Sequence, residues 1–233
     1  AWTPPVSLAA QIPNATSGWG TILCDTYVNG NLVSTNTCTF QLTVPASVVP
    51  SISNVAFSEA TSGIADRFGG YVRTRSKLSV SITATGTQGS SISAYRTSID
   101  SVTYSGSSFT TNALNTAGNL TMTVTVTDSR GRTASTARTV TVLDYLPPSL
   151  SQFTAERCNA DGTAAQTDGT KVRISAKASG SSVGGKNTLA CTVYYKLSSA
   201  ESWVSAVTLS PSDYVITATN RLLSPTFDAL SSY

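Results

Sequence analysis

Hydrophobic and polar residues alternate with a period of two along much of this chain. The pattern is clearest in segments 78–85, 120–127 and 172–179, where apolar residues occupy every second position and Ser, Thr, Lys or Arg the positions between. Successive side chains of a β-strand point to opposite faces of its sheet. Each segment is therefore predicted to be a strand with one face on a core and one in water. No convincing helical stripe exceeds two turns.

Turn-forming residues separate these predicted strands. Asn29-Gly30 lies between the apolar-polar runs 21–28 and 32–44, and Asn-Gly is the strongest short signal for a β-hairpin. The sequence Asp-Ser-Arg-Gly at 128–131 occupies the same place between runs 120–127 and 133–142. Two hairpins are therefore predicted.

The chain also resembles itself at two offsets. Residues 42–53 match residues 140–151 at a step of 98, as from Val44 to Val142 or from Pro50 to Pro148. Residues 77–86 match residues 171–180 at a step of 94. A loop deletion of four residues between the two matches accounts for the difference, so the chain contains an internal repeat.

Repeats of about 100 residues with short strands have the size of an immunoglobulin or fibronectin-III domain. We therefore predict an all-β protein of tandem immunoglobulin- or fibronectin-III-like β-sandwich modules. Residues 1–47 are expected to form the C-terminal half of a module, 48–147 a complete module, and 148–233 a module without its last strands. The chain is then expected to be a window of a longer array. Alternatively, a neighbouring copy or a circularly arranged terminus supplies the missing strands, since an open sandwich exposes edges and core.

Composition and charge argue against several functions. The net charge of +3 is too small for a dedicated binder of nucleic acid, and no apolar stretch is long enough to insert in a membrane. The chain has no histidine, the commonest general base and metal ligand. Its acids are scattered through turn sequences, and no G-x-S-x-G motif accompanies its serines. We therefore expect a protein that is not an enzyme and has no cofactor, and no signal peptide is visible.

Candidate metal sites are weak. The four cysteines form no C-x-x-C pair, which argues against structural zinc. Asp161-Gly162 and Asp168-Gly169 suggest a calcium loop, but their spacing does not fit one and ordinary turns use the same residues. We expect turns and assign no catalytic, cofactor-binding or metal-binding residue.

Two candidate binding surfaces have simpler interpretations. Arg73, Arg75 and Lys77, with Arg67 nearby, would share one face of an extended strand and bind acidic polymers, but we expect a solvated strand face. Trp203 follows the aromatic run 193–197, and such residues form sugar-binding platforms. A core tryptophan in a central strand is the expected role. Trp2 and Trp19 are expected to cover the base of the first module.

Several segments together resemble a siphophage minor structural protein family of unknown function, found in phages and prophages of Gram-positive bacteria. They are TPPVSLA (3–9), IPNATSG (12–18), CDTY (24–27), VPASVVPSI (44–52), VTDSRGRT (126–133) and YLPP (145–148). The resemblance implies a tail- or fibre-associated virion protein with immunoglobulin-like repeats, facing the host surface. No functional residues are carried over with it.

The resemblance sets the expected function. We expect a non-catalytic structural module that spaces parts of a phage tail or fibre and binds the host cell surface, such as cell-wall glycan. Its partners would be other virion proteins, with homo-oligomers inside an assembly. The alternative is a bacterial cell-surface adhesin stalk or a carbohydrate-binding module.

The state of the cysteines is left open by the sequence. Cys24 and Cys38 have an even spacing across the first hairpin, so a cross-strand disulfide is possible. We expect free thiols, because phage proteins assemble in a reducing cytosol. Nothing in the sequence decides whether Cys158 and Cys191 are close enough to bond.

Overall fold

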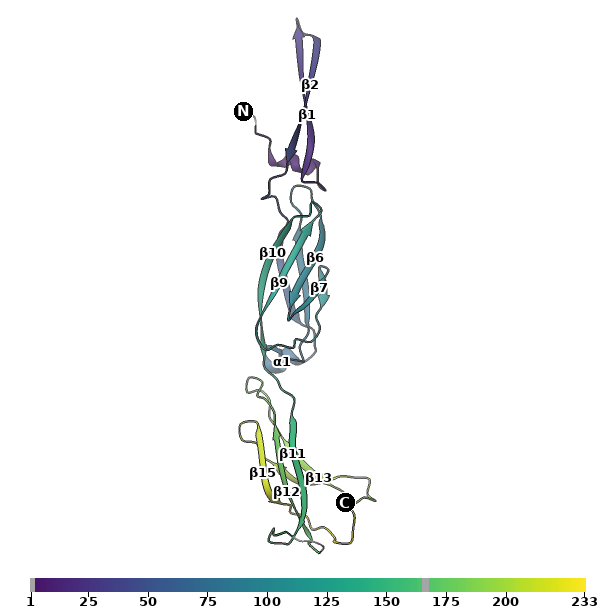
Figure 1. Cartoon of the computed structure of the whole chain (residues 1–233), viewed down its shortest axis with the longest axis vertical. Helices are drawn as coiled ribbons and strands as arrows, with labels where there is room; N and C mark the ends of the chain where they lie inside the picture. Colours follow the sequence, from purple (N-terminus) through teal and green to yellow (C-terminus); the bar gives the residue numbers. More distant parts are fainter. Residues whose placement is uncertain (1–2, 165–167) are drawn as a thin grey trace. The chain divides into compact units, whose positions relative to one another are not determined.

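The chain folds almost entirely as β-strands, in agreement with the alternating pattern. The computed structural model describes residues 3–164 and 168–233 (Figure 1). Strands make up 53% and helices 5% of the chain, so the predicted all-β class is confirmed. The helical elements are η1 (Val6–Gln11), a 3₁₀ helix, and α1 (Ile64–Phe68). The chain divides into two compact units: unit 1 comprises 1–64 and 75–142, and unit 2 comprises 65–74 and 143–233.

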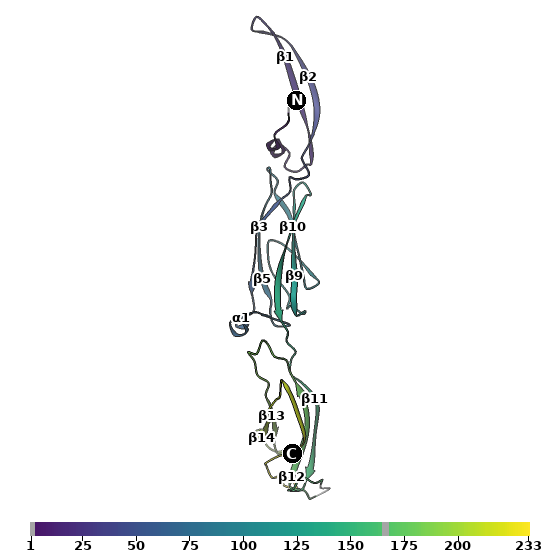
Figure 2. The ribbon, with the colours of Figure 1, turned by 90° about the vertical axis from the view of Figure 1, so that its left-hand side faces the viewer.

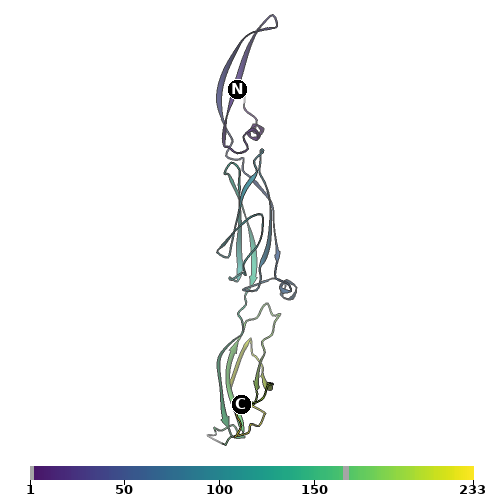
Figure 3. The same cartoon turned by 90° about the vertical axis from the view of Figure 1, so that its right-hand side faces the viewer.

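Unit 1 begins with a long hairpin of β1 (Ser17–Val28) and β2 (Asn31–Thr43). The strands pair antiparallel from Ser17↔Thr43 to Val28↔Asn31, and Asn29 and Gly30 have φ of 47° and 79°. A tight turn with two positive φ angles matches the twist of the strands, which confirms the predicted hairpin. The 3₁₀ helix η1 lies beside the base of the hairpin (Figure 3). Most side chains of the two strands are exposed.

The rest of unit 1 is a two-layered β-sandwich. In one sheet, β5 lies between β3 and β8, and in the other β10, β9, β6 and β7 follow one another. Figure 2 shows β3 and β5 in one layer and β9 and β10 in the other. The bounds are β3 Ser51–Glu59, β5 Leu78–Thr85, β8 Ser108–Thr110, β6 Ile92–Ile99, β7 Val102–Ser105, β9 Gly118–Asp128 and β10 Thr133–Leu143.

Alternation decides which side chains form the core of this sandwich. Val80 and Ile82 of β5 and Met122, Val124 and Val126 of β9 are buried, while the residues between them are mostly more exposed. The apolar face of each strand is removed from water against the opposite sheet, which is the main source of stability in such a fold. The predicted hairpin at 128–131 is confirmed as the β9–β10 connection.

Unit 2 contains a three-stranded and a two-stranded sheet. β12 lies between β11 and β15, and β13 pairs with β14. Ile174, Ala176, Ile216 and Phe227 form the centre of its core. The bounds are β11 Ser149–Cys158, β12 Lys171–Ser179, β13 Cys191–Tyr195, β14 Val204–Leu209 and β15 Val215–Leu222. The short strand β4 (Tyr71–Val72) belongs to neither sheet and precedes β10 in the order of the five-stranded sheet.

The sequence repeat is reproduced in the local structure of the two units. The β3–β5 ladder shifts register between Ile52 and Asn54, and the β11–β12 ladder shifts between Leu150 and Gln152, which is the same place at a step of 98. In each bulge a serine hydroxyl donates to the partner strand: Ser53 to the Thr83 carbonyl at 3.1 Å and Ser151 to the Lys177 carbonyl at 3.2 Å. The module boundaries at 47/48 and 147/148 stay a prediction.

A buried arginine joins the N-terminal segment to the sandwich in unit 1. Arg130 in the β9–β10 turn is only 7% exposed, and its guanidinium donates to four backbone carbonyls. Two belong to the segment before the hairpin and two to the β5–β6 loop: Ala9 (2.8 Å), Ile12 (3.3 Å), Thr87 (2.8 Å) and Gln88 (2.5 Å). Such charge-assisted bonds are stronger than neutral ones and satisfy carbonyls that would otherwise lack partners.

The same turn also holds the connector that follows the hairpin. Arg132 donates to the carbonyls of Val44 (2.5 Å), Pro45 and Val48 (3.1 Å). The Asp128 carboxylate accepts the backbone N–H groups of Arg130 and Arg132, both at 2.9 Å, and so fixes the turn. The base of the hairpin is therefore held to the sandwich through backbone groups.

We expect Arg130→Met to lower the free energy of unfolding of unit 1 by about 3 kcal/mol, because four buried or half-buried hydrogen bonds to backbone carbonyls lose their charged donor. Urea unfolding measures the change, and hydrogen exchange of residues 6–14 reports the loosened segment. Arg138→Met is the control, since Arg138 is an exposed residue of β10 that donates to its near neighbours Thr136 and Ala137. Equal stability of the two variants would contradict the assigned role.

Candidate functional site

Two aromatic side chains lie exposed on the outer face of β13 and β14 in unit 2. Cys191, Val193 and Tyr195 pack against the core, so alternation turns Tyr194 between them toward solvent. Trp203 immediately precedes β14, and the register Tyr195↔Val204 places it close to the same end of the strand pair. Tyr194 is 55% and Trp203 63% exposed, and together they line a shallow hollow of about 390 Å³. We call Tyr194, Trp203 and Lys196 the aromatic surface.

Lys196 adds a positive charge to this surface. Its Nζ lies 5.3 Å from the centre of the Trp203 ring, within the range of a cation–π interaction, and donates to the Ala200 carbonyl at 3.2 Å. Flat rings beside a fixed cation can stack on the apolar face of a sugar and attract an anionic substituent. The arrangement is suited to binding and contains no pair of groups poised for proton transfer.

The expectation that Trp203 is a core residue is wrong. Trp203 is 63% exposed, and the rings that pack together in this part of unit 2 are others: the centroids of Tyr195 and Phe227 lie 5.0 Å apart, and those of Phe227 and Tyr233 5.1 Å apart. Sequence reasoning considered the run 193–197, with Tyr194 and Lys196, as a sugar-binding platform beside Trp203 but expected a core role for the tryptophan. A signal was present, because Lys196 follows Tyr194 by two residues and so marks that strand face as exposed.

A turn near residue 233 fixes part of this aromatic cluster. The Asp228 carboxylate accepts the Leu230 N–H at 3.0 Å and the Ser231 hydroxyl at 2.8 Å, and these bonds hold the pKa of Asp228 below its usual value. The Asp228 N–H donates to the Tyr233 hydroxyl at 3.0 Å. Tyr233 is thereby kept against Phe227.

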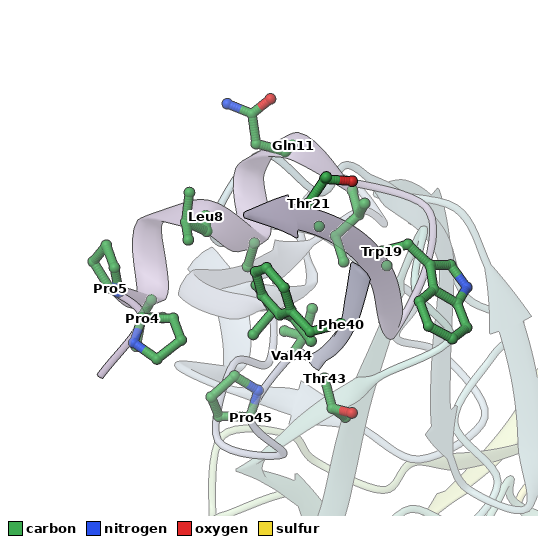
Figure 4. A pocket seen from close by; sticks show the side chains of 16 residues that line it. Pro4, Pro5, Leu8, Gln11, Trp19, Thr21, Phe40, Thr43, Val44 and Pro45 are labelled. Carbon is green, nitrogen blue, oxygen red and sulfur yellow. The ribbon is translucent and has the colours of Figure 1, made fainter. Parts of the chain in front are cut away.

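A second hollow, of about 540 Å³, lies at the base of the hairpin in unit 1 (Figure 4). Phe40 and Val44 face Leu8 and the prolines of the preceding segment, and the lining is mostly apolar, with Gln11, Thr21 and Thr43 as polar members. The prediction that Trp19 covers this base is wrong, because the ring is 75% exposed and η1 takes that place. Trp2, predicted for the same role, lies outside the described residues.

The predicted basic strand face does not form. Residues 73–75 make a turn with Thr74 at φ 62°, so Arg73, Arg75 and Lys77 do not alternate along one strand, and Arg67 belongs to α1. Arg73 pairs with Asp144 at 2.8 Å instead. The turn interrupts the alternation because a left-handed residue reverses the chain direction.

The candidate metal loop is a turn, as expected. The Asp161 carboxylate accepts the N–H of Thr163 at 2.9 Å and its hydroxyl at 2.7 Å, and these bonds lower the pKa of Asp161. Within residues 3–164 and 168–233, no group of three or more His, Cys, Asp or Glu is placed to hold a metal ion.

All four cysteines are free thiols. Cys24 and Cys38 share a face of the hairpin, but Cys24 pairs with Asn36 and Cys38 with Ile22. The two are thus diagonal neighbours, about 7–8 Å apart, which is too far for a relaxed disulfide. Cys158 is buried in unit 2 and Cys191 half-buried there. No helix among the described residues is long and apolar enough to cross a membrane.

The fold and site define an all-β protein whose clearest candidate for binding is an exposed aromatic surface. Residues 1–221 match the model of a family described as "Siphovirus protein of unknown function (DUF859)", and the chain belongs to this family. It is therefore a siphovirus protein, as its resemblance to a siphophage family predicts. Searches of curated proteins and of solved structures found no match.

Fluorescence tests the exposure of Trp203. In a chain carrying Trp2→Phe and Trp19→Phe, we expect the emission of Trp203 to be red-shifted and quenched by acrylamide almost as strongly as free indole. Unfolding in urea should change its quenching only slightly. A blue-shifted, protected emission would place the ring in the core and contradict the site.

Proposed function

We propose that this chain is a non-catalytic structural part of a siphovirus tail or fibre and binds glycan on the host cell surface through Tyr194 and Trp203. Membership of a siphovirus family supports a virion component. The observation that carries the binding role is the pair of exposed rings with a cation over one of them. Large exposed apolar side chains that gather at one place mark interaction sites.

The connector of unit 1 fits a spacing role. The arginine bonds of unit 1 fix the connector at residues 44–48 to the sandwich, which limits bending there. Binding by one aromatic surface can be weak, because many weak sites on one particle add up to firm attachment. No catalytic step is part of this proposal, and other virion proteins would be the chain's partners.

A bacterial surface adhesin stalk or a carbohydrate-binding module is the alternative. The aromatic surface suits such a protein equally well, while the siphovirus family favours the phage. Genes for tail assembly beside this gene would favour the first proposal, and a wall-sorting signal in the same gene would favour the second.

Location in the particle can be measured directly. We expect antibodies against this chain to label the tail of purified virions in negative-stain electron micrographs, and mass spectrometry to detect it in the same particles. Labelling of the capsid alone would contradict a tail role, and complete absence from virions would reject the structural role.

Binding can be assigned to the aromatic surface by a matched pair of variants. Trp203→Ala is expected to weaken binding to purified host cell walls roughly tenfold, because an aromatic anchor is lost. Trp19→Ala removes a tryptophan of the hairpin that is 75% exposed, against 63% for Trp203, and should leave binding unchanged. Both variants should melt within a few degrees of the parent chain. Equal binding by all three would reject the site, and equal loss in both variants would show nonspecific adhesion.

A further inference from the structure

In both units the strand that follows the connector lies at the edge of its sheet. Among the residues that the structure describes, β3 begins a sheet of order β3-β5-β8, and β11 begins a sheet of order β11-β12-β15. An edge strand presents backbone N–H and C=O groups on its outer side, where a strand of another molecule can bind. The two strands are 9 and 10 residues long, so each offers a long edge of this kind.

The ladder shows which backbone groups of β3 face outward. Ile82 of β5 donates its N–H to the carbonyl of Ser107, on the side of β8, at 2.8 Å. Its partner across the ladder, Val55 of β3, therefore directs its N–H and C=O away from β5, because residues of an antiparallel pair alternate between facing the partner strand and facing away. The same holds two residues apart along β3, as far as Glu59.

A β-bulge interrupts the beginning of this edge in both units. Ser53 is the extra residue of the β3 bulge, and Ser151 is the extra residue of the β11 bulge, 98 positions later. Each serine hydroxyl donates to a carbonyl of the partner strand, at 3.1 Å and 3.2 Å. A bulge bends its strand and increases the local twist, so a regular strand cannot continue the sheet past it.

The register of β3 does not require the extra serine. Ile52 is half-buried, Asn54 is exposed and Val55 is buried, so these three residues would alternate regularly if Ser53 were absent. Their partners in β5 are consecutive residues, which a ladder without a bulge would pair in the same way. The bulge therefore has a purpose other than the placement of core side chains.

A charged side chain lies on the inward face near the other end of each edge strand. Glu59 pairs with Leu78, which is fully buried, and the equivalent pair in unit 2 is Arg157 with Val172. Glu59 and Arg157 are both half-buried. A strand added at the edge would separate these charges further from water, at a cost in free energy. The sign of the charge differs between the units and its place is the same, which indicates that the place matters.

We propose that the serine bulge and the inward charge prevent strand addition at β3 and β11, so that copies of this chain do not pair through these edges. Without them, two β3 strands could pair antiparallel and join two three-stranded sheets into one. Such a contact is isologous and would give a dimer. The proposal is independent of glycan binding, because Ser53 and Glu59 lie outside the aromatic surface.

The edge in unit 1 is tested in the whole chain with a double variant. Deletion of Ser53 makes the edge continuous, and Glu59→Gln removes the charge but keeps the oxygen that accepts two backbone N–H groups. We expect a dimer whose dissociation constant is at least about tenfold below that of the parent chain, because a continuous edge forms additional backbone hydrogen bonds. Sedimentation velocity measures association, and circular dichroism checks folding. The amide of Val55 should become protected from hydrogen exchange in the dimer.

Lysine substitutions in the double variant are the matched controls. Ala56→Lys places a charge on the outer face of the edge strand and should restore the behaviour of the parent chain, since lysine is a common protection of sheet edges. Ser81 pairs with Ala56 and is also exposed. Ser81→Lys therefore places the same charge on the same face, one strand away from the edge, and should leave the dimer intact.

Several results would overturn the proposal. A folded double variant that sediments like the parent chain needs no protection at this edge. A dimer in which the Val55 amide exchanges as fast as in the parent chain uses another surface, and equal effects of the two lysines would show a general effect of charge. If deletion of Ser53 prevents folding, Glu59→Gln alone decides: tighter dimerisation with protection of Val55 supports the proposal, and unchanged sedimentation rejects it.

Discussion

Unit 1 depends on two arginine side chains that satisfy backbone carbonyls where three loops meet. A buried guanidinium is costly unless its donors are bonded, and here Arg130 bonds carbonyls from two different segments. Arg132 does the same for the connector after the hairpin. Because the acceptors are backbone atoms, the contact requires a defined path of the chain and few particular side chains. This is how a hairpin with little core of its own keeps a fixed base.

Equivalent strand positions in the two units are covered by a second sheet to different extents. Unit 1 contains both layers of a sandwich, the hairpin has two strands, and unit 2 has two sheets with an open inner face. Val55 and Phe153 occupy equivalent positions, yet only the first is shielded from water.

The aromatic surface has a different origin. It lies on the outer face of β13 and β14, where a sheet does not need apolar residues for its own stability. Large exposed rings that gather at one place mark interaction sites, and this is the basis of the proposed glycan binding. The family match itself shows a siphovirus protein.

The sequence by itself determined the strands, the two hairpins and the offset between related segments, because these depend on alternation and turn chemistry over a few residues. It also indicated free thiols and an ordinary turn at Asp161. Only the tertiary structure decided that Trp203 is exposed, that Arg73 to Lys77 form a turn, and that Arg130 reaches the carbonyl of Ala9. Alternation shows that a strand has two faces, but which face is covered depends on strands far away in the sequence.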